Sequence, residues 1–251
     1  MKRILTSALL ILIAAASRAD TLGEMRSALL QLGGKSAIKA TYEVRRSRQS
    51  EGRFVNDNFT GTVTVELESD NAAFRIVFPQ TLLATINDEQ RVRLLDSKKD
   101  TPTLNALWDV SPVTASGAVN FAPLLLRMID GGKIAGDRPV MVQGRPGHLL
   151  VLDLPPPKQP SGTFDLGRVT YENDRMTIWL GDDGVPVSAE HVRTTKASAL
   201  IFKAESKETE KWIFGRENDH LLRLRYETSV NASGLGQKGI SSTVFTLTPH
   251  R

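Results

Sequence analysis

The alternating stretch IKATYEVR at residues 38–45 decides the fold class of this chain. Its even positions are apolar and its odd positions polar, which puts all of the apolar side chains on one face of an extended strand. The same period of two recurs at residues 62–68 and 74–78. These segments predict a mainly β (α+β) fold built from an antiparallel meander with one apolar face.

Strand patterns continue toward the C-terminus. Residues 82–86 and 91–95 flank the polar run 87–90, a spacing typical of a hairpin. Residues 97–117 hold two prolines and many small polar side chains and predict a long loop, and residues 231–239 predict a flexible loop. Further strands are expected at residues 140–142, 148–154, 169–172, 176–180, 185–193, 200–204, 210–214, 221–226 and 243–247.

Two short helices accompany the strands. Thr21 and Glu24 have the spacing of a capping box, and Gly33-Gly34 supply a helix end, so residues 21–34 predict an N-terminal helix. Residues 121–129 predict a second helix, because Pro123 fits a first helical turn and glycines follow at 131 and 132. This second helix is unusually apolar, and we expect it to act as a lid over the sheet.

The first nineteen residues have the form of an export signal. Lys2 and Arg3 precede an apolar run at residues 4–16 that is shorter than the roughly 20 residues of a membrane-spanning helix. Small residues before Asp20 predict cleavage between Ala19 and Asp20. A membrane anchor is the alternative interpretation. We therefore expect a signal peptide at 1–19, a single β domain at 20–251, and a mature protein in the periplasm without a stable membrane span.

Composition excludes several classes of protein. Removing Lys2, Arg3 and Arg18 with the signal changes the net charge from +4 to 4 − 3 = +1. No basic cluster of the kind that binds nucleic acid remains. The chain has no cysteine, which excludes thiol nucleophiles and a lipid-modified N-terminal cysteine.

Sequence motifs favour a protein without catalytic activity. Gly234, Gly236 and Gly239 match a dinucleotide-binding spacing, but a strand pattern follows them where that motif needs a helix. The four histidines have no metal-ligand spacing. His191 lies beside Glu190, and neighbours in a strand point to opposite faces. We expect no enzyme, no metal and no cofactor.

The apolar residues of the strands and of the lid helix have two interpretations. They could fill an ordinary core, or they could line a cavity that holds an acyl chain. The candidate cavity residues are Val65, Leu67, Phe74, Ile76, Phe78, Leu125, Met128, Met176, Ile178, Leu222 and Leu224.

The order of these elements resembles the periplasmic lipoprotein carriers and their LolA/LolB-like relatives, the outer-membrane lipoprotein-sorting proteins. The resemblance covers roughly residues 20–215 and includes the capped helix, the hairpin over 61–78, the FRIVFP segment at 74–79, the 86–92 turn and the lid helix. It implies a curved, incomplete antiparallel barrel closed by helices around a hydrophobic cavity. The chain from Arg216 onward forms an extended C-terminal ending outside the resemblance.

From these observations we expect a carrier or sensor of the cell envelope that binds lipid or the acyl chains of a lipoprotein, with an envelope protein as a second expected partner. One alternative is a non-catalytic structural or interaction module with a filled core. Another is a hydrolase whose site is assembled from residues far apart in the sequence.

Overall fold

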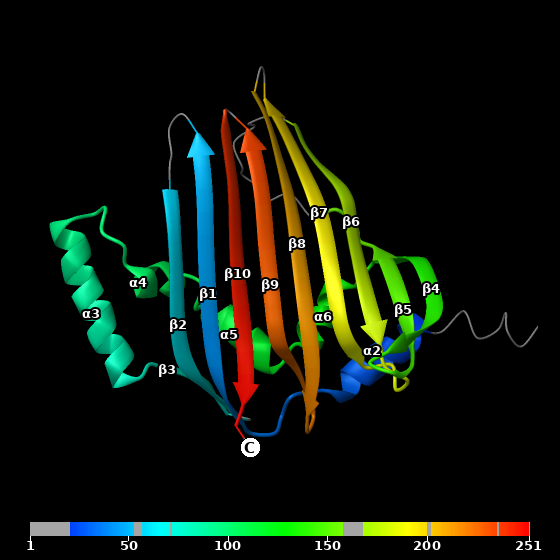
Figure 1. Ribbon diagram of the computed structural model, residues 1–251. Helices are drawn as coiled ribbons and strands as arrows, with labels where there is room; N and C mark the ends of the chain where they lie inside the picture. Colours follow the sequence, from blue (N-terminus) through cyan, green and yellow to red (C-terminus); the bar gives the residue numbers. More distant parts are fainter. Residues whose placement is uncertain are drawn as a thin grey trace, which may run out of the picture.

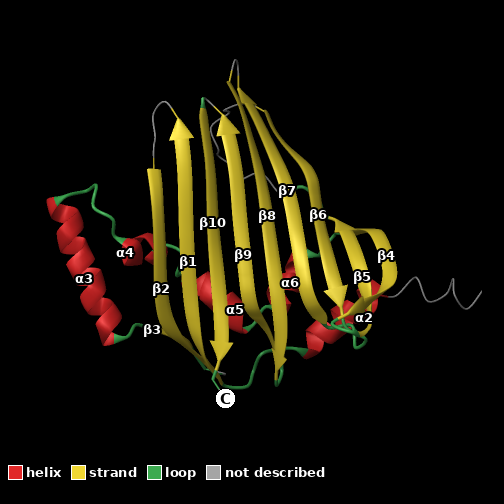
Figure 2. Cartoon of the chain, viewed as in Figure 1, coloured by secondary structure: helices red, strands yellow, loops and turns green. Residues whose placement is uncertain are grey.

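The computed structural model describes residues 21–52, 57–70, 72–157, 168–199, 202–234 and 236–250. The expected signal peptide and its cleavage point between Ala19 and Asp20 lie outside these residues. The described part contains five helices and ten strands (Figure 1 and Figure 2). Their bounds are α2 Thr21–Gln31, β1 Ile38–Gly52, β2 Asp57–Ser69, β3 Phe74–Val77, α3 Gln80–Leu95, α4 Pro102–Leu107, α5 Pro112–Val119, α6 Ala122–Met128, β4 Lys133–Val142, β5 Arg145–Asp153, β6 Arg168–Leu180, β7 Pro186–Ala199, β8 Phe202–Glu217, β9 His220–Gly234 and β10 Gln237–Pro249.

The ten strands form one sheet in the order β3-β2-β1-β10-β9-β8-β7-β6-β5-β4. All neighbouring strands run antiparallel, and the sheet is open, with β3 at one edge and β4 at the other. The prediction of a mainly β, antiparallel fold is therefore confirmed. The two expected helices are present as α2 and α6, and three further helices lie between β3 and α6.

The C-terminal strand lies in the middle of the sheet. Strand β10 pairs with β1 on one side and with β9 on the other, and Val44 of β1 lies opposite Phe245 of β10. The chain from Arg216 onward, expected as an extended ending, thus supplies the strands that join the N-terminal hairpin to the rest of the sheet (Figure 1).

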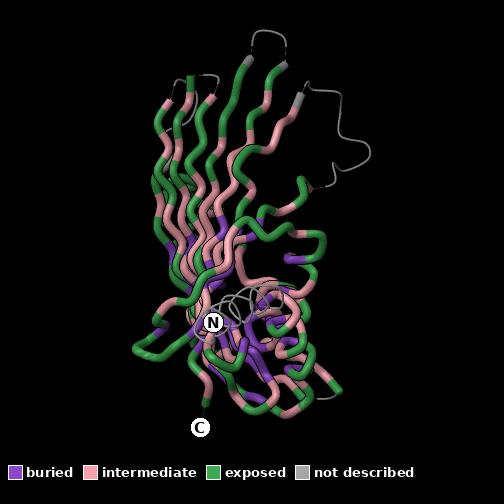
Figure 3. The backbone as a smooth tube through the Cα atoms, turned by 90° about the vertical axis from the view of Figure 1, so that its right-hand side faces the viewer, coloured by how far each residue is buried: buried purple, intermediate pink, exposed green. Residues whose placement is uncertain are grey.

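Helices cover part of one face of the sheet. Viewed from the side, the buried residues gather in the half of the sheet against which the helices lie, while the other half consists of strands with intermediate and exposed residues (Figure 3). The alternation of β1 places its apolar side chains on the covered face, where Ile38, Ala40, Tyr42 and Val44 are all buried. Their polar neighbours point to the opposite, solvated face.

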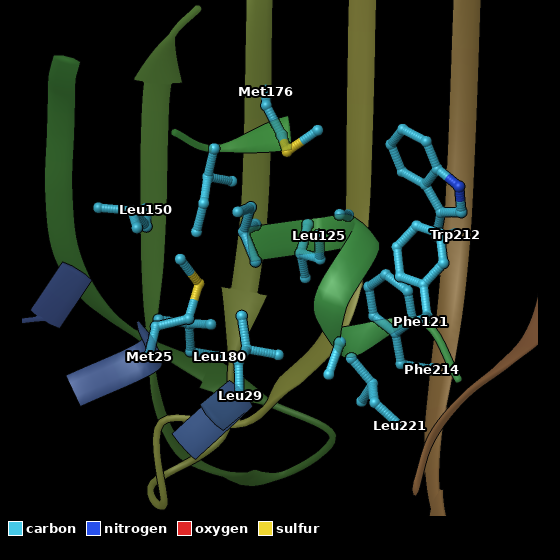
Figure 4. Close-up of a cluster of buried hydrophobic side chains, with 14 of the residues drawn as sticks. Met25, Leu29, Phe121, Leu125, Leu150, Met176, Leu180, Trp212, Phe214 and Leu221 are labelled. Atoms are coloured by element: carbon cyan, nitrogen blue, oxygen red, sulfur yellow. The ribbon is translucent and has the colours of Figure 1, made fainter. Parts of the chain in front are cut away.

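The covered half holds two hydrophobic clusters. One is formed by α2, α6 and strands β5 to β9 (Figure 4). Its buried members are Met25, Leu29, Leu32, Phe121, Ala122, Leu125, Ile129, Leu150, Leu152, Met176, Ile178, Leu180, Ala189, Trp212, Phe214 and Leu221. The other lies between the β2-β1-β10-β9 part of the sheet and helices α4 and α5. Its buried members are Ile38, Ala40, Tyr42, Val44, Val63, Val65, Leu67, Ala106, Ala115, Ala118, Val119, Leu222, Phe245 and Leu247.

The predicted hairpin at residues 82–95 is wrong. This segment is α3, a single helix over Gln80–Leu95 that begins directly after Pro79. Its leucines do not alternate with polar residues, and alanine, glutamate, glutamine and arginine favour a helix. The polar run at 87–90 therefore continues a solvated helix and does not form a turn.

The predicted long loop at residues 97–117 is also wrong, because α4 and α5 occupy most of it. Pro102 and Pro112 each stand at the start of a helix, where the missing N–H of proline has no cost. Ser111 caps α5, since its side-chain oxygen accepts a hydrogen bond from the Thr114 N–H at 3.1 Å. Prolines that the sequence analysis treated as loop residues are helix starts.

Residues 231–239 do not form the predicted flexible loop. Asn231 to Gly234 continue β9, and Gln237 to Gly239 begin β10, so the two strands form a hairpin. Gly236 has a φ of +73°, a left-handed conformation that glycine adopts without steric cost. The expected strands at 169–172 and 176–180 are one strand, β6, interrupted by a bulge between Glu172 and Arg175.

Candidate functional site

An apolar groove lies between α3 and α4. Gln90, Arg93 and Leu94 line it from α3, and Leu104 and Leu107 from α4, with Trp108 directly after α4. Its volume is about 460 Å³, within the roughly 300–1,000 Å³ range of small-molecule pockets. Helix α4 packs on β2, and α3 lies farther out, beyond β2 in the front view (Figure 1).

Close contact with a glycine positions α4 on the sheet. A Cβ atom at Gly61 of β2 would lie 2.8 Å from the Ala106 nitrogen and would also meet the carbonyl oxygen of Pro102. Such distances do not occur between real atoms, so α4 can lie this close only because position 61 has no side chain. The sequence of β2 thus determines where one wall of the groove stands.

Polar contacts hold α3 against α4. The carboxylate of Glu89 accepts hydrogen bonds from the backbone N–H groups of Thr103 at 3.0 Å and Leu104 at 2.8 Å. The Arg93 guanidinium donates to Oδ1 of Asn105 at 2.9 Å. The two bonds to Glu89 satisfy free N–H groups at the start of α4. They fix the separation of the two helices, and hence the width of the groove.

Large apolar side chains remain in solvent around this groove. Leu94 is 87% exposed, Leu95 is 90% exposed and Trp108 is 78% exposed. By contrast, Ile86 is the one buried residue of α3. A contiguous exposed apolar surface of this kind is typical of an interaction or ligand site.

The structure divides the predicted cavity residues between the two clusters. Those that contribute to the first cluster are Leu125, Met128, Met176 and Ile178. Those that contribute to the second are Val65, Leu67, Phe74, Ile76, Phe78, Leu222 and Leu224. Of the eleven, Phe74, Ile76, Phe78, Met128 and Leu224 are partly buried and the others are fully buried.

Sequence reasoning missed the α3–α4 groove because it assigned residues 82–95 to strands. One signal was available. The adjacent Leu94 and Leu95 cannot both face a core in a strand, and Trp108 stood in a segment predicted to be a long loop. An apolar pair and a tryptophan without a buried face could have indicated a surface site.

Acidic and histidine side chains from distant segments converge at a second place, on the inner face of the sheet. His191 of β7 places Nε2 at 2.6 Å from Oδ1 of Asp174 and Nδ1 at 2.9 Å from Oε2 of Glu210. The hydroxyl of Tyr226 donates to Oε1 of Glu210 at 2.5 Å. The network joins four adjacent strands, β6 to β9. Glu190, expected to face away from His191, pairs with Lys211 instead.

Burial, charge and hydrogen bonding shift the pKa values of His191, Glu210 and Tyr226. Burial opposes the charged form of His191, but hydrogen bonds to Glu210 and Asp174 outweigh it, so the pKa of His191 is raised. Burial alone would raise the pKa of Glu210, but hydrogen bonds from His191 and Tyr226 lower it. Burial, with the nearby Glu210 charge, raises the pKa of Tyr226.

The geometry of His191 suits a structural cation better than a catalytic base. A general base needs a ring nitrogen that can reach a substrate proton. Both nitrogens of His191 face carboxylates, and its side chain is 6% exposed. The acidic and histidine side chains that a hydrolase would require do lie together here, but their polar atoms form hydrogen bonds with one another.

A buried arginine connects α5 to the centre of the sheet. Arg223 of β9 donates from Nη2 to the Thr114 carbonyl oxygen at 3.0 Å, and its Cζ lies 4.5 Å from the ring centroid of Tyr226 and 5.4 Å from that of Phe121. Burial lowers the pKa of Arg223 and raises that of Tyr42 to about 12. Aromatic faces stabilise the cation through cation–π contacts, and Arg223 thus fixes α5 over the second cluster.

Within the described ranges, no group of three or more acidic or histidine residues is arranged to hold a metal ion. None of the described helices combines the length and the hydropathy that crossing a membrane requires. No protein-family model matches the sequence, and no curated protein matches it either. The resemblance to lipoprotein carriers therefore stays a prediction.

Proposed function

We propose that this protein binds a single apolar chain, from a lipid or from the acyl group of a lipoprotein, as a non-catalytic carrier or sensor of the cell envelope. The observation that carries the proposal is the apolar groove between α3 and α4. Leucines and a tryptophan line this groove, and the two polar residues in it, Gln90 and Arg93, come from α3. Such a lining offers a wide apolar contact with few groups that need a polar ligand.

The groove is large enough for a useful binding energy. Each methylene removed from water contributes about 0.8 kcal/mol, so eight buried methylenes would contribute about 6 kcal/mol before the chain loses its conformational freedom. A volume of about 460 Å³ suits one acyl segment better than a complete diacyl lipid. We therefore place one chain in the groove.

The N-terminal sequence supports an envelope location. Lys2 and Arg3 followed by the apolar run at 4–16 are typical of a protein that is exported. The chain has no cysteine that could carry a covalent lipid. A groove for an acyl chain would let it hold lipid non-covalently.

Quenching of Trp108 tests the proposal. The chain has three tryptophans, and Trp108 is 78% exposed in the groove while Trp212 is 3% exposed in the core. A monomeric fatty acid brominated on its chain should quench Trp108 on contact. Trp108→Phe should abolish the quenching with the apolar lining preserved, and Leu94→Asp should weaken the interaction.

The matched control for this experiment is Ile240→Asp, which changes an apolar residue of β10 that is 51% exposed. It should leave the quenching unchanged. The proposal fails if the fatty acid quenches nothing, or if the quenching persists in Trp108→Phe and so arises from Trp179 or Trp212.

The two filled clusters favour a second candidate, a structural or interaction module of the envelope. Residues expected to line a cavity contact one another and the helices, and Met176, Ile178 and Leu125 have no exposed surface. In that case the exposed leucines of α3 would bind a protein. A stable complex recovered by crosslinking at Leu94, with no fatty-acid quenching, would favour this candidate.

A further inference from the structure

The end of α3 combines exposed apolar residues with exposed cations. Leu94 and Leu95 stand on the last turn of α3, and Lys98 and Lys99 follow after Asp96 and Ser97. All four are exposed, and Trp108 lies beside Leu94 at the groove. Leucine, tryptophan and lysine side chains together are the composition that lies at a membrane–water interface.

The acidic residues of this segment make contacts within the protein. Glu89 caps α4, Asp96 accepts a hydrogen bond from the Lys98 N–H at 3.0 Å, and Asp100 accepts one from the Asn105 side chain at 3.3 Å. Among the described residues neither Lys98 nor Lys99 has an ion-pair partner. Asp96 and Asp100 are exposed and keep their charges, but each accepts a hydrogen bond from the protein itself, whereas Lys98 and Lys99 are available to a lipid phosphate.

The position of α3 leaves this tip accessible. The helix lies outside the β2 edge and is separate from the rest of the sheet in the front view (Figure 1). Its second half contacts α4 by way of Glu89 and Arg93, while Leu82 near its start packs against the second cluster. The last turn of α3 can therefore enter a flat surface without meeting the sheet.

We propose that the tip of α3, defined as Leu94, Leu95, Lys98 and Lys99 together with Trp108, docks on an anionic phospholipid surface. The two leucines and the tryptophan enter the headgroup region, and the two lysines contact lipid phosphates. Buried apolar area and attraction to anionic lipid are the two sources of affinity for such a surface. The inference rests on the proposed function, because it identifies the lipid surface as the place where the groove receives its chain.

Vesicle co-sedimentation tests this docking with the full mature protein. Vesicles of phosphatidylglycerol in phosphatidylcholine should bind the protein, and vesicles of phosphatidylcholine alone should bind it at least tenfold less. Added salt should weaken the binding, because it screens the lysines. The Leu94→Glu/Leu95→Glu variant and the Lys98→Glu/Lys99→Glu variant should each lower the partition about tenfold or more.

The matched control is Lys238→Glu/Ile240→Glu, which places the same changes on exposed residues of β10. Circular dichroism of each variant checks that it folds. The docking is overturned if anionic vesicles do not bind the protein, if both tip variants bind like wild type, or if the control loses binding equally.

Combining the two assays separates this inference from the proposed function. If monomeric brominated fatty acid still quenches Trp108 while vesicles do not bind, the groove binds acyl chains and the docking inference is wrong. If vesicles bind through the tip while the fatty acid does not quench, docking stands and the proposed acyl site is wrong.

Discussion

The Nδ1 atom of His191 lies 2.9 Å from the Oε2 atom of Glu210, on the strand next to it, and both side chains are shielded from solvent. With Asp174 at 2.6 Å on the other ring nitrogen, the imidazole is held between two carboxylates. Only the protonated ring donates to both of them. The centre of the sheet therefore contains a buried ion pair whose state depends on pH.

This pair predicts a stability maximum at intermediate pH. The pKa of His191 is raised on folding, so its contribution is complete below the pKa of the unfolded histidine and is lost as the pH rises through the folded value. The pKa of Glu210 is lowered, so its contribution is present above the pKa of the unfolded group and is lost as the pH falls through the folded value. The free energy of unfolding, measured with urea across pH, should therefore fall on an acidic limb and on an alkaline limb.

His191→Ala should weaken the alkaline limb and lower the free energy of unfolding by about 3 kcal/mol near neutral pH, because it leaves two carboxylates buried without their cation. His250→Ala is the control, since His250 is 47% exposed. An unchanged alkaline limb in His191→Ala would contradict this role of the ion pair.

A second buried histidine joins three separate segments. His220 at the start of β9 places Nδ1 at 2.8 Å from the Val119 carbonyl oxygen and Nε2 at 2.7 Å from that of Ser36, and the residue has no exposed surface. His220→Ala would leave the buried Val119 carbonyl and the partly buried Ser36 carbonyl without this partner, so we expect a loss of about 2–3 kcal/mol in unfolding free energy. A loss within 0.5 kcal/mol of His250→Ala would show that water replaces these contacts.

Gly61→Ala should displace α4. The new methyl group would meet the backbone of Pro102 and Ala106, which cannot move as a flexible side chain would. We expect a loss of about 1–3 kcal/mol in stability and weaker fatty-acid quenching of Trp108, because one wall of the groove shifts. Gly33→Ala is the control, since the nearest atom to its new Cβ would be the end of Lys35 at 3.9 Å. Equal quenching in both variants would show that acyl binding in the groove does not depend on the position of α4.

Leu125→Ala tests whether the space under α6 is filled. Leu125 is 0% exposed within the first cluster. In a packed core its truncation should cost about 2–5 kcal/mol, measured by urea unfolding. Beside it, Leu30→Ala of α2 serves as the control, because Leu30 is 72% exposed. A cost below about 1 kcal/mol for Leu125→Ala would instead indicate an open cavity beneath the helix.

Structural features that depend on neighbouring residues in one segment could be predicted from the sequence. The inner face of β1 could be predicted, because the alternation of residues 38–45 is a property of neighbouring side chains. The capped start of α2 and the prolines and glycines around α6 are similarly local. The segment 82–95 was assigned wrongly because its polar run at 87–90 between apolar residues resembles a hairpin turn, although its composition favours a helix.

The candidate site was less predictable than the fold. Leu94 is on α3 and Trp108 follows α4, so no spacing rule within one element connects them. His191 could be singled out, but its partners Asp174 and Glu210 come from two other strands, and their convergence depends on register. Alternation identifies which face a residue occupies, not which residues of other strands lie beside it.

By itself, the sequence determined that the chain forms amphipathic antiparallel strands with one buried face, because side-chain periodicity acts within a single segment. Only the tertiary structure decided that β10 pairs with β1, that the apolar residues divide into two clusters, and that α3 stays outside the sheet. Those outcomes depend on contacts between segments from opposite ends of the chain. The free energy of such contacts is gained only when the whole sheet assembles.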